Sequence, residues 1–218
     1  MNEVPHAVDD EVGGATGTRW WLVRHAPIVP EKRGTIVGRT DAPAGLPIEA
    51  ATPRRLLPET ALWFVSPALR AAQTAAALGA TSWATEPDLQ EQDFGAWEGK
   101  TWAELLRTES LAGRYLEAYD RVRPPRGECL EDVRARVRPV LARLASELSA
   151  RDVIVVTHAG PIRCLVCDVL GIPLGSALKL SIDHLSVTLL EGQAGAWQVR
   201  GVNWGGRPAA LPDVPARV

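Results

Sequence analysis

The side chains best suited to chemistry are two histidines and two arginines, each at the end of an apolar run or shortly after one: Arg24, His25, Arg70 and His158. A neutral imidazole is a competent nucleophile when a hydrogen bond holds its other ring nitrogen. Guanidinium groups bind the oxygens of phosphates and carboxylates, and the carboxylic acid of a nearby glutamate can protonate a leaving alkoxide. This set suits attack of a histidine on phosphorus, because phosphoryl transfer depends mainly on positioning and charge stabilisation.

The pattern of apolar runs and helical periods predicts the elements that position these side chains. Buried strands are expected at residues 19–24, 61–65 and 152–157, with two or three more within 177–202. Helices are expected at residues 48–57, 66–78, 101–109, 111–119, 130–150 and from 161 onward. Ser66 is expected to cap the second helix, and the segments 27–47 and 89–99 are expected to be loops.

Strands separated by helices favour an α/β fold. We expect three α/β/α layers with a mostly parallel central sheet and a small helical cap. Ligands bind beyond the carboxyl ends of parallel strands. The turns that carry His25, Arg70 and His158 should therefore meet at one edge of the sheet.

Length and composition indicate one domain of ordinary globular type. The chain has 218 residues, 46% of them hydrophobic, and a formal net charge of -2, which gives no reason to expect nucleic acid or an anionic membrane as partner. We expect a disordered tail over residues 1–18, the functional domain over 19–205 and a loose tail over 206–218. No stretch reaches the ~18 apolar residues of a membrane helix, and the acidic N-terminus lacks an apolar signal region.

The three cysteines do not make a disulfide framework. Cys164 and Cys167 form a C-x-x-C without a second pair at zinc-finger spacing, so both are expected in the core. We therefore expect a cytoplasmic protein. A small-molecule phosphate ester is the partner expected from the histidine and arginine set, and a homodimer is a further possibility.

Four segments carry a resemblance to the histidine phosphatase superfamily, in its phosphoglycerate-mutase-like branch. LVRHA (Leu22–Ala26) resembles the R-H-G signature, and SPALRAAQTA (Ser66–Ala75) resembles S-P-x-x-R-A-x-Q-T-A. LQEQDFGAWEG (Leu89–Gly99) is similar to the L-x-E-x-x-x-G-x-W-E-G loop, and VTHAGPIR (Val156–Arg163) to V-x-H-G-G-x-I-R. The four occur in the family's order, so chance co-occurrence is negligible.

The resemblance implies a role for five residues. His25 would be the nucleophile that forms a phosphohistidine intermediate. Arg24, Arg70 and His158 would form the phosphate pocket, and Glu91 would be the proton donor. No metal and no organic cofactor is implied.

The chain departs from the family pattern at three positions. Ala26 and Ala159 stand where the family has glycine, and both are small enough for close approach to phosphate, so Ala159 is expected at the substrate. Glu31 stands where the family often has asparagine. We expect Glu31 to point away from the phosphate or the 27–47 loop to be re-routed, with a backbone N–H between Gly34 and Gly38 as the replacement donor.

The chain also resembles alpha-ribazole phosphatases of cobalamin nucleotide-loop assembly in three segments: GRTDAP (Gly38–Pro43), DFGAWEG (Asp93–Gly99) and RGECLEDVRARV (Arg126–Val137). The substrate would then be alpha-ribazole 5′-phosphate. Trp97 or Trp102 would flank its apolar base, or lie in the core, and Arg126 and Glu128 would contact substrate at the rim. The chain lacks the R-H-Y-G segment of the mutases, which favours hydrolysis over mutation.

Alternatives remain within the family and outside it. The chain could be a broad-specificity sugar-phosphate phosphatase, a phosphoglycerate mutase or a non-catalytic phosphate-binding module. Secreted acid phosphatases and phytases fit badly, because Ala159 and not aspartate follows His158. A metal hydrolase using His25, His158 and Glu91 lacks any H-x-x-x-H or H-x-H pair. His184 could line the pocket edge, although a satisfied strand histidine is the favoured interpretation.

Overall fold

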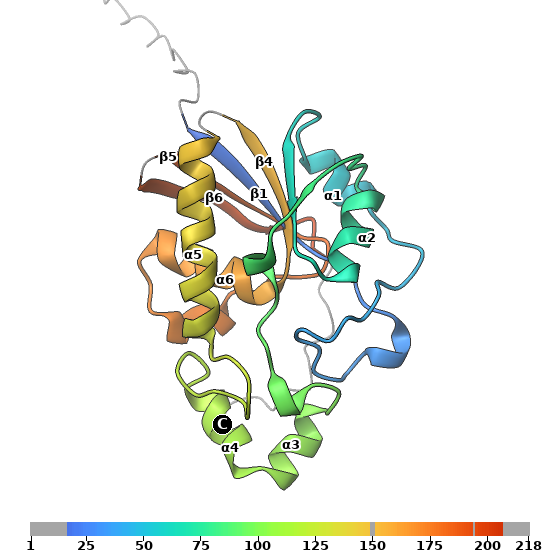
Figure 1. Ribbon diagram of the computed structural model, residues 1–218, viewed down its shortest axis with the longest axis vertical. Coiled ribbons are helices and arrows are strands. Elements are labelled where there is room, and N and C mark those ends of the chain that lie inside the picture. The colour runs from blue at the N-terminus through green and yellow to red at the C-terminus, as the bar shows by residue number, and fades with distance from the viewer. Residues whose placement is uncertain (1–16, 149–150, 194, 207–218) are drawn as a thin grey trace, which may run out of the picture.

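The computed structural model describes residues 17–148, 151–193 and 195–206 and shows a three-layer α/β/α domain (Figure 1). Its six-stranded sheet has the order β3-β2-β4-β1-β5-β6. The parallel strands are β1 (Thr18–Arg24), β2 (Leu62–Val65), β3 (Ala84–Thr85) and β4 (Asp152–Thr157). The antiparallel strands are β5 (Val187–Gln193) and β6 (Ala196–Trp204). The expected α/β class with a mostly parallel sheet is confirmed.

Alternate residues of the central strands pack on opposite faces of the sheet, as the period of a strand requires. Trp20 and Leu22 join a core with α5 (Leu130–Glu147) and α6 (Ala159–Leu170). Val23 joins a second core with residues 71–78 at α2 (Leu69–Ala77), and α1 (Ala51–Leu56) lies on the same side. Because both faces are covered, the central strands are continuously apolar.

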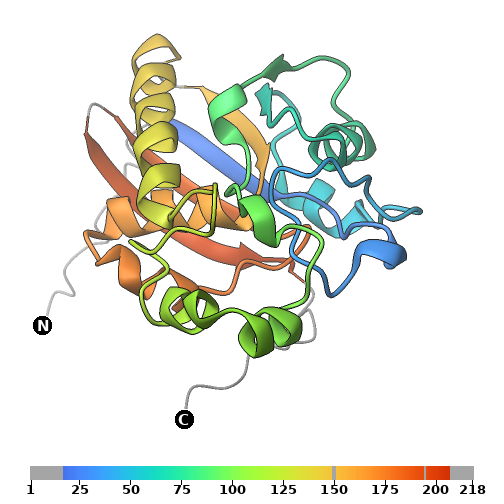
Figure 2. The ribbon, with the colours of Figure 1, turned by 60° about the horizontal axis from the view of Figure 1, so that its bottom comes forward.

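Two short helices form the cap, α3 (Trp102–Thr108) and α4 (Ser110–Glu117). They lie beyond one end of the sheet in Figure 1, and Figure 2 brings them to the front. An aromatic cluster holds them. Trp102 stacks on Tyr115 with ring centroids 5.6 Å apart, and Trp97 meets Tyr115 edge-on at 5.3 Å.

Four 3-10 helices complete the structure: Pro30–Lys32, Pro87–Leu89, Gly95–Trp97 and Leu174–Lys179. The last of these corrects the expectation that strands begin at residue 177. The two-residue strand β3 was not predicted, because so short a segment has no readable period. Within the described residues, no helix has both the length and the apolar character needed to cross a membrane.

The N-terminus of α2 also differs from expectation. Ser66 does not cap the helix, whose N-cap is Ala68. Instead Asp41 Oδ1 accepts a hydrogen bond from the Leu69 N–H (2.8 Å), so the 27–47 loop caps α2 from outside. Thr18 already belongs to β1, while residues 1–16 and 207–218 of the two expected tails lie outside the described residues.

Candidate active site

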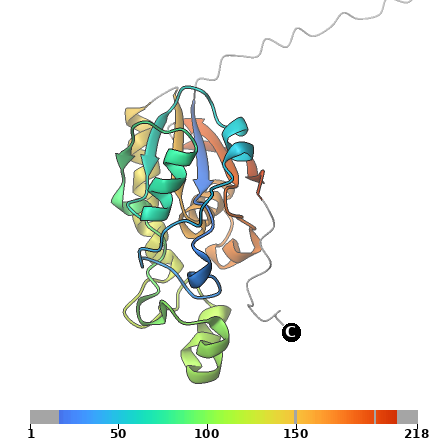
Figure 3. The same ribbon diagram turned by 90° about the vertical axis from the view of Figure 1, so that its right-hand side faces the viewer.

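The carboxyl ends of three parallel strands bring the predicted residues together, as the side view in Figure 3 helps to follow. Arg24 at the end of β1 lies opposite Thr157 at the end of β4. The His25 N–H donates to Thr157 O (2.9 Å), and the Ser66 N–H donates to a carbonyl of β4 (3.0 Å). His158 is the next residue after β4, so all three turns share one edge.

His25 is buried and held in one tautomer. Its Nδ1 lies 2.7 Å from Ala26 O, and a carbonyl can only accept, so Nδ1 carries the proton and Nε2 carries the lone pair. Thr74 Oγ1 accepts from the Ala26 N–H (2.9 Å), which ties this turn to α2. Burial, followed by the nearby charges of His158 and other groups, holds the pKa of His25 well below its ordinary value. The side chain is therefore a neutral imidazole whose Nε2 carries no proton.

His158 is fully buried, with both ring nitrogens occupied. Arg70 Nη2 lies 3.2 Å from Nδ1, and a guanidinium can only donate, so Nδ1 accepts. Nε2 then carries the proton and donates to Ser66 Oγ (2.8 Å). Burial, with the charges of Arg70 and Arg24, holds the pKa of His158 well below its ordinary value. Ser66, which we predicted as a helix cap, thus orients a site histidine.

Arg70 lies at the centre of the site and is 1% exposed. Its Nε donates to His25 Nε2 (3.3 Å), Nη2 to Gly38 O (2.7 Å) and Nη1 to Thr40 O (3.1 Å). The Glu98 carboxylate accepts from the N–H groups of Arg39 (2.8 Å) and Thr40 (2.6 Å) and so fixes the loop that holds Arg70. Sequence reasoning assigned no role to Glu98.

Arg24 is held by two neutral acceptors. Nη1 donates to Ile182 O (2.6 Å), and Nη2 donates to His184 Nε2 (3.1 Å). Its Nε is buried and has no hydrogen-bond partner within the described part of the chain. Burial lowers the pKa of Arg24 to about 10, so the guanidinium stays charged at neutral pH.

Glu91 reaches the site from the 89–99 loop. Its Oε1 accepts from the Gly160 N–H (3.1 Å) at the start of α6, where a Cβ on Gly160 would collide with this carboxylate. Arg136 of α5 donates to Glu91 O (2.9 Å) and Gln90 O (2.8 Å), which holds the loop in place. The second glycine of the V-x-H-G-G-x-I-R pattern is therefore required for Glu91 to approach.

Arg163 belongs to the same site, although sequence reasoning gave it no role. Its Nε donates to Leu180 O (3.0 Å), two residues before the carbonyl that holds Arg24. Burial lowers the pKa of Arg163, while the charge of Glu91 raises it. No carboxylate forms an ion pair with Arg163 among the residues that the structure describes. Its place in VTHAGPIR was the one signal that could have found it.

One substrate contact is corrected. Of the two expectations for Trp97, the core is the right one, because its side chain is 0% exposed and its Nε1–H donates to Glu109 Oε2 (3.1 Å). Gly38 lies at the site, where its carbonyl accepts from Arg70 Nη2. A backbone N–H donor between Gly34 and Gly38 stays a prediction.

The structure also shows the surroundings of Ala159, Glu31, Arg126 and Glu128. Ala159 is buried at the start of α6 beside His158. Glu31 is exposed, as expected of a carboxylate turned away from the pocket, and Arg126 is exposed in the cap. Glu128 forms ion pairs with Arg39 and Arg136. The contacts of Arg126 and Glu128 with substrate stay predictions.

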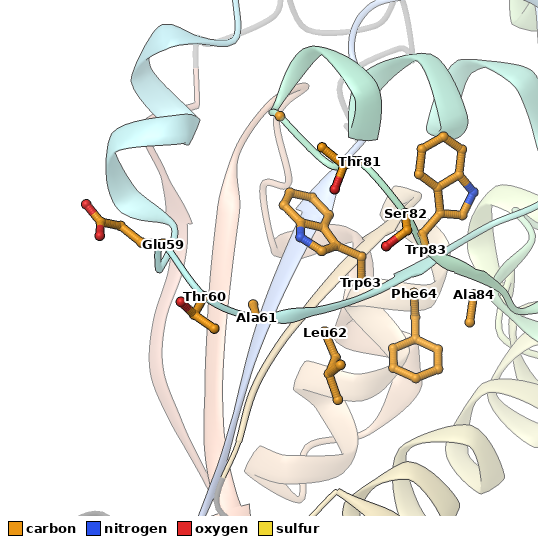
Figure 4. A pocket seen from close by; sticks show the side chains of 11 residues that line it. Glu59, Thr60, Ala61, Leu62, Trp63, Phe64, Thr81, Ser82, Trp83 and Ala84 are labelled. Atoms are coloured by element: carbon orange, nitrogen blue, oxygen red, sulfur yellow. The ribbon is translucent and has the colours of Figure 1, made fainter.

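The described residues form cavities near the sheet, and two of them differ in their position relative to the site. One, of about 510 Å³, is lined by Trp63 and Trp83 and lies at the start of β2, away from all the predicted residues (Figure 4). The other, of about 790 Å³, lies beside the site and is lined by Pro27, Leu46 and His184 among others. No group of three or more histidine, cysteine or carboxylate side chains is placed to hold a metal ion among the described residues.

The geometry places a buried neutral histidine beside two arginines at the carboxyl edge of an α/β sheet. The family model of the histidine phosphatase superfamily (branch 1) matches residues 20–205. The chain therefore belongs to the histidine phosphatase superfamily.

The chain is similar in sequence to proteins that carry different names. A bifunctional protein of Mycobacterium tuberculosis is 39% identical over 134 residues, which are 61% of this chain and 36% of that protein. Phosphoserine phosphatase 1 of Hydrogenobacter thermophilus is 27% identical over 107 residues, 49% of this chain and 51% of that protein. These matches span well under two thirds of the relatives' own length.

A solved structure has the same fold. The alpha-ribazole phosphatase of Shigella flexneri superposes with a TM-score of 0.76 at 21% identity, and the match covers 88% of this chain and 99% of that chain.

Proposed function

We propose that this protein is a phosphomonoesterase that works through a phosphohistidine intermediate on His25. The observation that carries the proposal is the bond between His25 Nδ1–H and Ala26 O, because it leaves the Nε2 lone pair facing Arg70. In the first step Nε2 attacks phosphorus, an N–P bond forms, and the P–O bond to the leaving alkoxide breaks. Arg24 and Arg70 stabilise the charge on the phosphoryl oxygens, and His158 holds Arg70 in place through its Nδ1.

Glu91 serves as the acid and then as the base. It gives its proton to the leaving alkoxide, and in the second step it takes a proton from the water that attacks the phosphohistidine. Free phosphate and neutral His25 are then restored. Since Arg24 and Arg70 supply the positive charge, we propose that turnover requires no metal ion.

We propose alpha-ribazole 5′-phosphate, or a similar small phosphate ester, as substrate. The segments Gly38–Pro43 and Arg126–Val137 support this proposal, as does the fold shared with the alpha-ribazole phosphatase. A second class is favoured by one observation, because Arg163 offers a further positive charge beside Arg24 and Glu91. A phosphorylated carboxylic acid such as phosphoserine would use it. A cytoplasmic location is supported by the three unpaired buried cysteines.

The test is phosphate release, with EDTA present, by wild type and by His25→Ala. The panel includes p-nitrophenyl phosphate, alpha-ribazole 5′-phosphate, phosphoserine, 3-phosphoglycerate and a sugar bisphosphate. We expect activity that survives EDTA and falls more than about a thousandfold in the variant. Glu31→Gln, on the exposed loop, is the control and should behave as wild type. Loss of activity in EDTA, or an active His25→Ala, would refute the mechanism.

A further inference from the structure

His184 contacts both Arg24 and His25 at the end of β1. Its Nδ1 lies 2.9 Å from His25 O, so Nδ1 carries the proton and donates to that carbonyl. Its Nε2 must then be an acceptor, and Arg24 Nη2 lies 3.1 Å from it. The His25 and His184 ring centroids are 5.0 Å apart. The contact therefore links the guanidinium of Arg24 to the backbone of the neighbouring nucleophile.

The charge state of His184 decides what this contact does to Arg24. Burial, followed by the charge of Arg24, lowers the pKa of His184 to about 3, so the imidazole is neutral at physiological pH. The other acceptor of Arg24, Ile182 O, is also neutral. A carboxylate in the place of His184 would hold the guanidinium equally well, but it would cancel the positive charge that a phosphoryl group needs. No acidic residue pairs with Arg24 in the described ranges.

The contacts of Arg24 leave one donor unused. Ile182 and His184 take Nη1 and Nη2, while the buried Nε has no partner within the described residues. With two of its three nitrogens held, the guanidinium has little freedom to rotate. Its direction is therefore set by His184 and the 182 carbonyl before substrate arrives, which lowers the cost of ordering it on binding.

We propose that His184 is a positioning residue that aims Arg24 at the phosphoryl oxygens and leaves its full charge available to them. The inference rests on the proposed function and adds a residue that the motifs do not single out. His184 does not touch the reacting atoms; it acts through Arg24.

The test compares His184→Ala, His184→Gln and His184→Glu. The carbonyl oxygen of glutamine reaches about as far as Nε2, so it can accept from Arg24, and glutamate has the same shape but carries a charge. Two readouts are taken: kcat/KM for p-nitrophenyl phosphate, and the affinity for orthovanadate by calorimetry. Thermal unfolding of each variant reports whether the fold is intact.

We expect His184→Ala to lose about 10- to 100-fold in both readouts, the usual worth of a hydrogen bond to a charged group. His184→Gln should recover to within about fivefold of wild type, while His184→Glu should stay at least about tenfold below His184→Gln. An Ala variant equal to wild type, or equal Gln and Glu variants, would overturn the proposal. If wild type hydrolyses none of the esters in the panel, the proposed function fails, and the vanadate affinities alone decide the role of His184.

Discussion

Arg70 Nε lies 3.3 Å from His25 Nε2, so a permanently charged donor is directed at the lone pair of a buried imidazole. A guanidinium cannot accept a hydrogen bond, so this contact requires the neutral histidine. The same side chain is anchored by Gly38 O and Thr40 O. A phosphoryl group that enters between the two residues meets the nucleophile and the charge together.

Replacing Arg70 should damage both catalysis and stability. Arg70→Ala removes a charged donor from the transition state, and we expect a loss of about 100- to 1,000-fold in kcat/KM. It also leaves the buried carbonyl of Gly38 unpaired, so the free energy of unfolding should fall by about 1–3 kcal/mol. Kinetics and urea denaturation measure the two effects. Arg55→Ala, on the outer face of α1, should change neither.

Glu91→Gln should remove the proton donor and leave the other contacts of the site in place. Glutamine keeps an oxygen for the Gly160 N–H but has no proton to give. We expect a loss of about 100- to 10,000-fold with an alkyl phosphate, and a much smaller loss with p-nitrophenyl phosphate, whose leaving group needs little protonation. Asp93→Asn is the neighbouring control. Equal losses with the two substrates would argue against Glu91 as the acid.

The pH profile should report the protonation of His25. Protonation of His25 stops attack, and because its pKa lies well below 6.5, the acid limb of kcat/KM should also lie below pH 6.5. An acid limb at or above pH 6.5 would contradict the assignment of His25 as the nucleophile.

Stability should fall in acid because buried histidines are neutral in the folded state. The pKa values of His25, His158 and His184 lie below 6.5 in the fold, whereas the unfolded chain has the ordinary value. Below about pH 6.5 the unfolded state therefore binds more protons, and each histidine lowers the unfolding free energy by up to about 1.4 kcal/mol per pH unit. Above pH 6.5 their contribution is complete.

The contribution of His184 to this pH dependence can be measured by itself, because its pKa in the folded state is about 3. Between pH 6 and 4, the unfolding free energy of His184→Gln should fall less steeply than that of wild type, by roughly 1.4 kcal/mol per pH unit. Urea denaturation at several pH values measures the two slopes. Parallel curves would mean that His184 is charged in the folded state.

Trp97→Phe should affect the cap and not substrate binding. The change removes the hydrogen bond to Glu109 and part of a buried ring, so we expect about 1–3 kcal/mol lower stability. The KM for alpha-ribazole 5′-phosphate should stay within twofold of wild type. Trp83→Phe, on a partly exposed tryptophan, is the matched control. A raised KM with unchanged stability would restore Trp97 to the substrate.

The sequence by itself determined the fold class and the main site residues. Apolar runs of strand length and helical periods are local patterns, and they predicted β1, β2 and β4 with the helices between them. Because the carboxyl ends of parallel strands share one edge, the same patterns predicted that His25, Arg70 and His158 lie close together. The motif segments then added Glu91.

Only the tertiary structure decided which nitrogen of each histidine carries the proton and which neighbours hold the ring. Ser66 meets His158 across 92 positions of the chain, and His184 meets Arg24 across 160. No local pattern encodes such contacts, because they depend on how distant segments pack. The same reason explains Trp97: a tryptophan in a loop has the same letter whether it faces a substrate or the core, and only the packing of α3 and α4 against it places it inside.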